Sequence, residues 1–262
     1  MATVEHVDDP DDPRLADYVG LTDADRRRRG DVFLCESVLV IRRAIETGTE
    51  LQSVLVTPAK LVELEPDLAA LDVSVFVATQ PVMNQITGFA IHRGAIAAAT
   101  PPAHATLDAL LTAPTIAVLE SINDHENLGS LFRNAAAFGV GAVLLDPVTV
   151  DPLYRRSVRV SLGHVMTVPH RRLDDWPAGL EDVRRAGYQL VALTPSADAE
   201  PIDTVPVTGK VAFLLGAEGP GLSSAALDAA DRHVRIPVSP AVDSLNVATA
   251  AAIAFHHRFR AG

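Results

Sequence analysis

The sequence predicts an α/β protein whose C-terminal part is a parallel sheet covered by helices on both faces. Two observations lead to this prediction. Short, continuously apolar segments at 115–120, 141–146 and 211–216 have the length and composition of buried strands. Segments with helical spacing of apolar residues alternate with them, and strands that alternate with helices form parallel sheets of this kind.

The first hundred residues predict a smaller α/β unit. Residues 1–20 predict an acidic, flexible tail, because the first thirteen positions hold five carboxylates and no Lys or Arg. Residues 21–100 alternate strand-like and helical segments, and a helical run from 38 ends at Gly48. The segment 101–112 opens with two prolines and predicts a linker.

The second domain, 113–262, alternates strands and helices throughout. After its first strand, apolar positions from Leu128 to Phe138 recur at helical spacing, and Asn127 is placed to cap this helix. The further elements expected are strands at 141–146, 188–194, 211–216 and 233–238, and helices at 154–162, 180–186, 222–230 and 245–258. Ligands of such sheets bind at the carboxyl ends of the strands.

Composition excludes several classes of protein. The chain has 262 residues, of which 48% are hydrophobic and 21% charged, so it is neither disordered nor fibrous. It has no run of eighteen apolar residues and no apolar leader segment, so we expect no membrane partner and a cytoplasmic location. Cys35 is the single cysteine, which rules out an internal disulfide and a Cys-based zinc site, and no metal site is expected.

The charge balance gives two opposite indications about a nucleic-acid partner. A net charge of −11 argues against a polyanionic partner. However, 20 of the 22 basic residues are Arg, whose planar fork binds two phosphate oxygens better than Lys does. The arginines cluster at 26–29, 42–43 and 155–159. Such clusters are typical of phosphate-binding surfaces, but ordinary solvated helix faces carry them as well.

Three loops at predicted strand ends carry the candidate chemistry. The first loop contains the predicted cap Asn127, the small Gly129 and Arg133, which projects away from the apolar stripe. This combination suits the binding of an anion or a ribose. The second, 214–223, is rich in glycine and contains Glu218, but matches neither a Walker A loop nor G-x-G-x-x-G. The third, 235–258, leads into an Ala-rich helix. Each loop taken alone is also compatible with a purely structural turn or cap.

Together, the loops resemble the three signature motifs of the SpoU (TrmH-like) family of RNA 2′-O-ribose methyltransferases, in the SPOUT superfamily. The first is similar to N-x-G-N-[IL]-G-x-x-x-R-[TN]-A-x-x-F-G, the second contains GAEGPGLS, and the third contains RIP and SLNV. The resemblance covers about 115–260, and 31–99 more weakly resemble the L30e-like substrate-binding domain. Two departures are Asp124-His125-Glu126 before Asn127, where the family has N-P-G, and Ala248 in place of Ser.

The resemblance implies a C-terminal domain with a trefoil knot, preceded by the L30e-like domain, and S-adenosylmethionine as the cofactor. The implied cofactor-binding residues are Gly216, Ile236, Leu245, Leu215, Val238 and Thr194. The implied catalytic residues are Arg133, Asn127, Glu218, Asn246 and Ser244. Because an Arg with a pKa above ~12 is a poor base, we expect Arg133 to clamp the target phosphate and stabilise the developing alkoxide.

The implied partners are rRNA or tRNA and a second copy of the chain in a homodimer. The residues expected to contact RNA are Arg26, Arg27, Arg28, Arg29, Arg42, Arg155 and Arg159. Two other functions stay open. One is a non-catalytic RNA-binding protein that keeps the fold. The other is a dinucleotide-binding oxidoreductase, for which the expected G-x-G-x-x-G is missing.

Overall fold

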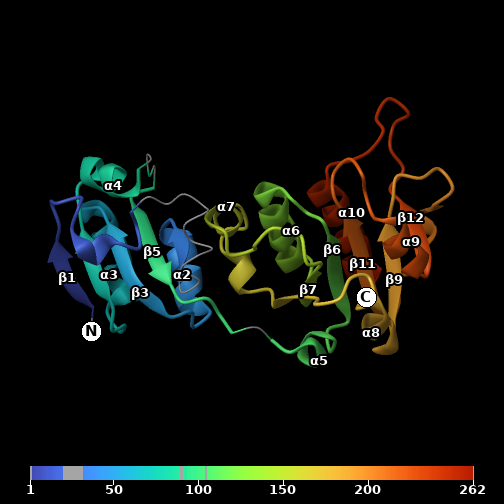
Figure 1. Cartoon of the computed structure of the whole chain (residues 1–262), viewed down its shortest axis with the longest axis horizontal. Coiled ribbons are helices and arrows are strands. Elements are labelled where there is room, and N and C mark those ends of the chain that lie inside the picture. Colours follow the sequence, from blue (N-terminus) through green and yellow to red (C-terminus); the bar gives the residue numbers. More distant parts are fainter. Residues whose placement is uncertain (1, 20–31, 89–90, 92, 104, 262) are drawn as a thin grey trace. The chain divides into compact units, whose positions relative to one another are not determined.

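The computed structural model describes residues 2–19, 32–88, 91, 93–103 and 105–261 (Figure 1). The chain forms two compact units. The N-terminal unit comprises Met1–Ala103 and Leu153–Met166, and the C-terminal unit comprises His104–Pro152 and Thr167–Gly262. The segment 153–166, expected within the second domain, is therefore grouped with the first. Among the described helices, none combines the length and hydropathy needed to span a bilayer.

A five-stranded mixed sheet forms the centre of the N-terminal unit, in the order β1-β4-β3-β5-β2. β1 and β3 run parallel to β4, whereas β5 runs antiparallel to β2 and β3. The strands are β1 Thr3–His6, β2 Phe33–Glu36, β3 Leu51–Val56, β4 Ser74–Val77 and β5 Ala95–Ala99. The helical elements are η1 Pro13–Leu15, α2 Val38–Glu46, α3 Pro58–Leu68, α4 Gln80–Thr87, α7 Arg155–Val160 and η2 His164–Met166.

The expectation of a flexible tail at residues 1–20 is wrong for the described part of that segment. β1 adds an edge strand to the sheet by pairing with β4. Leu15 and Tyr18 are completely buried, and the Tyr18 hydroxyl lies 2.7 Å from the Ser53 hydroxyl. The segment contains the four-residue strand β1 and the two buried residues Leu15 and Tyr18. Both features are too short to give a periodic hydrophobic pattern, so the sequence did not predict them.

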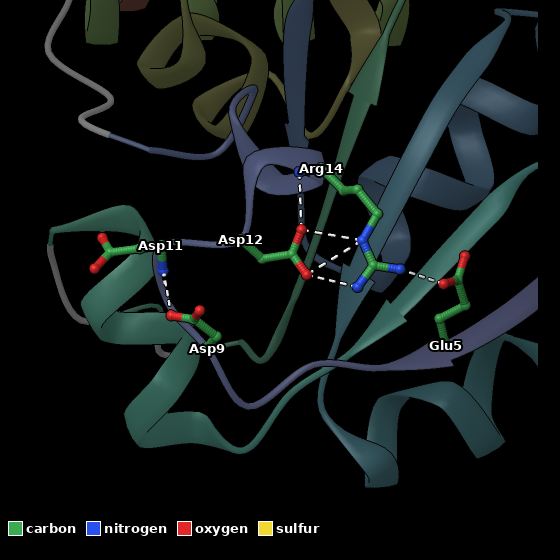
Figure 2. Close-up of polar contacts among 5 residues, drawn as sticks. All are labelled: Glu5, Asp9, Asp11, Asp12 and Arg14. Atoms are coloured by element: carbon green, nitrogen blue, oxygen red, sulfur yellow. Dashed lines mark hydrogen bonds and ion pairs between the residues drawn. The ribbon is translucent and has the colours of Figure 1, made fainter.

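The carboxylates of this segment are used in local structure (Figure 2). Asp12 accepts hydrogen bonds from the backbone N–H of Arg14 at 2.9 Å and from its Nε at 3.0 Å. The Arg14 guanidinium also pairs with Glu5 and lies 5.6 Å from the centre of the Phe76 ring. The hydrogen bonds from Arg14 lower the pKa of Asp12 to about 2. This part of the acidic segment is thus a folded edge of the sheet.

The sheet of the C-terminal unit has seven strands in the order β10-β12-β9-β11-β6-β7-β8, and all of its pairings are parallel. The strands are β6 Thr115–Glu120, β7 Ala142–Leu145, β8 His170–Arg172, β9 Tyr188–Leu193, β10 Glu200–Pro201, β11 Lys210–Gly216 and β12 Arg232–Arg235. The helices are α5 Leu107–Leu110, α6 His125–Ala137, α8 Leu180–Arg185, α9 Ser224–Ala229 and α10 Val247–Ala261, with η3 at Ile202–Thr204. The predicted α/β fold with a parallel sheet is confirmed.

Helices cover both faces of this sheet because alternate residues of its central strands point in opposite directions. On one face, Leu214 of β11 belongs to an apolar cluster that includes Leu180 of α8 and Ala226 of α9. On the other face, the rings of Phe213 and Phe255 of α10 lie 5.9 Å apart, and α6 packs against α10. Continuous apolar strands such as β11 are the sequence signature of this double burial.

The predicted linker at 101–112 is in part a piece of the C-terminal unit. Residues 107–110 form α5, whose N-terminus is capped by the Thr106 hydroxyl accepting from the backbone N–H of Ala109 at 3.3 Å. Leu110 and Leu111 are buried in the same apolar cluster as Leu214. The two prolines end the first unit, but the chain resumes regular structure sooner than they suggest.

Candidate active site

A cavity of about 690 Å³ lies at the carboxyl ends of β9, β11 and β12 in the C-terminal unit. Its walls come from three segments, 193–197, 215–221 and 234–247, together with Ala250 of α10. Nine of the predicted site residues line it: Thr194, Leu215, Gly216, Glu218, Ile236, Val238, Ser244, Leu245 and Asn246. Loops that follow three neighbouring parallel strands meet at one edge of the sheet, which explains how distant segments converge here.

The glycine-rich loop after β11 folds back on the end of its own strand. The backbone N–H of Gly221 donates to the carbonyl of Ala217 at 3.0 Å, which closes the turn. A Cβ atom at Gly216 would lie 2.2 Å from the Gly221 carbonyl carbon, so no larger residue fits there without moving the loop. Gly219 at the tip has a φ of 87°, which favours glycine. Glu218 is thereby presented, exposed, at the cavity.

Asn246 holds together three segments of the site. Its Oδ1 accepts from the backbone N–H groups of Ala248 at 3.0 Å and Thr249 at 3.2 Å, in the first turn of α10. Its Nδ2 donates to Asn127 Oδ1 at 2.7 Å and to Glu218 Oε1 at 2.6 Å. Because the amide oxygen faces helix N–H groups, the amide nitrogen must face the two acceptors. The orientation of the side chain is therefore fixed by all four contacts.

Asn127 reaches this cluster from the first turn of α6, but it does not cap that helix as predicted. The helix begins earlier, and Asp124 is its N-cap, with Oδ1 accepting from the backbone N–H groups of Glu126 at 2.6 Å and Asn127 at 3.1 Å. Asp is as good a cap as Asn, so the sequence contained two competing start signals. Because Asn127 does not cap the helix, its side-chain oxygen can accept the hydrogen bond from Asn246.

Arg133 lies further along α6 and is exposed. It does not line the cavity, and its side chain makes no hydrogen bond or ion pair with any residue that the structure describes. Asn134 beside it donates to the carbonyl of Ala248 at 2.8 Å, which ties α6 to the start of α10. The helix that carries Arg133 is thus fixed, while the guanidinium itself remains available for an anion.

Three of the other arginines predicted to contact RNA lie beside carboxylates of the protein. Arg42 Nε donates to Asp67 at 2.9 Å, and this hydrogen bond raises the pKa of Arg42. Arg155 pairs with the buried Glu36 at 3.1 Å, and Arg159 approaches the same carboxylate at 4.0 Å. These guanidinium groups are held by carboxylates of their own unit. Arg26, Arg27, Arg28 and Arg29 lie outside the described residues.

Sequence reasoning missed Glu120, the last residue of β6. Its carboxylate is only 5% exposed and accepts hydrogen bonds from Trp176 and Ser223. The available signal was a charged residue ending an otherwise apolar strand, directly before the first motif. Its partners lie 56 and 103 residues away, so no local pattern could identify them.

The described residues contain no group of three or more His, Cys, Asp or Glu side chains suited to a metal ion. Cys35 is buried in the N-terminal unit, and burial raises the pKa of its thiol to about 12. A neutral thiol is a poor nucleophile at physiological pH.

Residues 114–256 match the SpoU rRNA methylase family. An uncharacterized tRNA/rRNA methyltransferase of Mycobacterium tuberculosis is 45% identical over 99% of this chain and 93% of its own length. A 23S rRNA (guanosine-2′-O-)-methyltransferase, RlmB, of Nitrosomonas europaea is 33% identical over 69% of this chain and 71% of its own length.

Solved structures agree with this match. A crystal structure of an RNA 2′-O ribose methyltransferase aligns with a TM-score of 0.79 and 27% identity, over 100% of this chain and 99% of that chain. An AdoMet-bound rRNA methyltransferase from Sinorhizobium meliloti aligns with a TM-score of 0.84 over 98% of both chains. At 24% identity, the second likeness concerns the fold alone.

Proposed function

The chain belongs to the SpoU rRNA methylase family, and from this premise we propose that it transfers a methyl group from S-adenosylmethionine to a ribose 2′-hydroxyl of structured RNA, either rRNA or tRNA. The observation that carries the proposal is the hydrogen-bonded cluster of Asn127, Glu218 and Asn246 beside an apolar cavity. The 2′-O position is supported by the activity of the RlmB relative, a 23S rRNA (guanosine-2′-O-)-methyltransferase.

The cavity fits the proposed cofactor. Its volume of about 690 Å³ is within the range of sites that enclose small organic ligands. Leu215, Ile236 and Leu245 offer apolar walls for an adenine ring, with backbone groups between them. The charged side chains that line it are Glu218, Asp243 and Arg235, which gives a small negative excess. Such an excess favours a cationic sulfonium ligand over an anionic one.

When bound, S-adenosylmethionine supplies a methyl group on a positively charged sulfur. The residues of the chain then need to bring in the 2′-oxygen and stabilise the negative charge that develops on it. Arg133 suits this task, because its exposed guanidinium donates several hydrogen bonds in one plane and stays protonated. We assign to it the clamp on the target phosphate and the stabilisation of the alkoxide, not the removal of the proton, which passes to solvent water.

The three clustered residues orient the reacting groups. Asn246 fixes the first turn of α6 and the loop after β11 relative to α10, so the Asn127 and Glu218 side chains keep a constant spacing. Constant spacing of this kind lowers the entropic part of the barrier. Ser244 is exposed at the cavity rim, where its hydroxyl can hydrogen-bond to substrate or cofactor.

The remaining parts of the proposal concern assembly. We propose that the C-terminal unit contains a trefoil knot and that the N-terminal unit is an L30e-like domain that binds RNA, with Arg26–Arg29 contributing. We also propose a cytoplasmic homodimer. The exposed Ile253 and Phe259, 37% and 61% accessible, lie on α10, which packs against the helix of Arg133 and offers apolar area for a second copy.

The test is methyl transfer from tritium-labelled S-adenosylmethionine to total RNA of the source cell, using the wild type and Arg133→Ala. We expect Arg133-dependent labelling and, after digestion to nucleosides, the label on the ribose. Resistance of the labelled linkage to alkali provides an independent check. Label on a base would contradict the 2′-O assignment. Cofactor binding with no labelling of any RNA would favour the non-catalytic RNA-binding alternative.

A further inference from the structure

Glu120 is a buried carboxylate with three hydrogen bonds outside its own strand. Oε1 accepts from Trp176 Nε1 at 2.6 Å and from the Ser223 hydroxyl at 2.7 Å, while Oε2 accepts from the backbone N–H of Ser223 at 2.8 Å. Both oxygens are therefore satisfied, as a buried polar group requires. Two of the three bonds converge on a single residue, Ser223.

Ser223 is the point where the glycine-rich loop ends and α9 begins. Its hydroxyl oxygen accepts from the backbone N–H of Ala226 at 3.2 Å and so caps the helix, while its proton is donated to Glu120. A hydroxyl has one donor and two lone pairs, so the two roles are compatible. Glu120 thereby holds the backbone and the side chain of Ser223 in one position.

The loop between Gly216 and Ser223 carries Glu218. At its start, the loop is held by continuity with β11 and by the close approach of Gly216 to the Gly221 backbone. At its end, it is held by the two bonds between Ser223 and Glu120. Glu218, between these two anchors, accepts the 2.6 Å hydrogen bond from Asn246. Loss of the second anchor would increase the positional freedom of Glu218 and of the cavity wall beside it.

We propose that Glu120 is a positioning residue for the site, which acts through Ser223 on the Glu218 loop. This inference rests on the proposed function, because the reaction it serves is methyl transfer. An apolar side chain at this position would leave the Ser223 N–H and hydroxyl and the Trp176 Nε1–H without their acceptor. The carboxylate is directed at the end of the one loop that supplies both Glu218 and the wall at 215–221.

The test compares Glu120→Gln with Trp176→Phe. The glutamine has nearly the same size, but its amide has only one acceptor oxygen, so its NH₂ group must face an N–H donor of Ser223 or Trp176. Trp176→Phe removes one bond from the same carboxylate and leaves both bonds to Ser223 in place. The two variants therefore separate loss of the loop anchor from loss of a neighbouring contact.

The first measurement is backbone hydrogen exchange of residues 217–219, 221 and 222 in the ligand-free protein, since Pro220 has no backbone N–H. We expect clearly faster exchange in Glu120→Gln and little change in Trp176→Phe, because local opening reports how firmly a segment is held. Equal exchange of this loop in wild type and Glu120→Gln would overturn the inference. If Glu120→Gln does not fold, Ser223→Ala keeps the N–H bond, removes the hydroxyl bond, and serves in its place with the same expected direction.

The second measurement is calorimetric titration with S-adenosylmethionine. We expect about tenfold weaker binding for Glu120→Gln, because a tenfold change in affinity corresponds to about the free energy of one hydrogen bond. For Trp176→Phe, we expect a change in affinity of less than about twofold. Equal weakening in both variants, in proportion to their lost thermal stability, would mean a purely structural role. Absence of binding to the wild type would contradict the proposed function instead, and the exchange experiment would still decide whether Glu120 holds the loop.

Discussion

Three arginines of this molecule, two in the N-terminal unit and one in the C-terminal unit, lie in opposite environments. In the N-terminal unit, Arg42 and Arg155 are paired with the carboxylates of Asp67 and Glu36. In the C-terminal unit, Arg133 is exposed on α6 and its side chain has no hydrogen bond or ion pair among the described residues. A guanidinium held by a carboxylate has fewer N–H donors and less net positive charge to offer to a phosphate. The comparison teaches that the composition of an arginine cluster says less about RNA binding than the partners of each side chain.

Replacing Arg133 by Ala is the change with the largest expected effect. Removal of a group that stabilises transition-state charge typically lowers the rate about 100- to 1,000-fold. Because Arg133 is exposed, folding and cofactor binding should remain as in the wild type. The matched control is Arg42→Ala, which breaks a surface pair with Asp67 and should change the methylation rate only a few-fold. Similar methylation rates for Arg133→Ala and Arg42→Ala would contradict the assignment of the phosphate clamp to Arg133.

Substitutions of Asn246 sharpen the comparison at the cavity itself. In Asn246→Asp, an oxygen can still cap α10, but the donor that faces Glu218 at 2.6 Å becomes a second carboxylate oxygen. We expect a loss of activity of about 10- to 100-fold, because like charges at this distance repel and the pKa of one of the two carboxyls rises. Activity should recover in part as the pH falls and that carboxyl takes up a proton. A pH–rate profile parallel to that of the wild type would contradict this account.

In the N-terminal unit, loss of the ion pair between Arg155 and Glu36 should lower the stability of the protein and leave catalysis unchanged. Glu36→Gln leaves the half-buried Arg155 with a weaker partner and should lower the free energy of unfolding by about 2 kcal/mol. Glu63→Gln, which breaks the exposed pair with Lys60, should lower it by less than about 0.5 kcal/mol. Scanning calorimetry measures both. The prediction fails if Glu36→Gln is as stable as the control, or if it binds RNA markedly better with unchanged stability.

The smallest expected effect is a gain in stability at Ser37, beside the same pair. Ser37 has φ 99° and ψ 153°, a backbone region that almost only glycine occupies. Its hydroxyl caps α2 through a long 3.4 Å contact to Val40. Ser37→Gly should therefore raise the free energy of unfolding by about 1 kcal/mol, because the relieved strain exceeds the cost of a weaker cap. An unchanged or lower unfolding midpoint in calorimetry would show that this corner is not strained.

The parallel sheet could be predicted because its strands are continuously apolar, as in β11. A continuous apolar run of this length identifies a buried strand even when the predicted ends of the strand are displaced. The loops of Asn127, Glu218 and Asn246 were found from their motifs, and the structure joins them by direct hydrogen bonds. Their roles remain proposals, because a hydrogen bond fixes geometry and does not reveal what binds.

Other features could not be read from the sequence. The pairing of β1 with β4 joins segments some seventy residues apart through four residues each, and neither segment has a period that reveals its partner. The segment 153–166 is held by a carboxylate at position 36, more than a hundred residues earlier. The cap of α6 was misplaced because Asp124 and Asn127 are equally good candidates. In each case, the deciding contact is distant, or two local signals compete.

The most direct test of the central claim is a calorimetric titration of S-adenosylmethionine into three forms of the protein. In the proposed function, the cofactor binds in the cavity of the C-terminal unit and Arg133 binds phosphate. We therefore expect one site per chain with equal affinity in the wild type and Arg133→Ala, and at least about tenfold weaker binding in Ile236→Asp, which places a carboxylate in the cavity wall. No binding to the wild type, or equal binding by a folded Ile236→Asp, would contradict it.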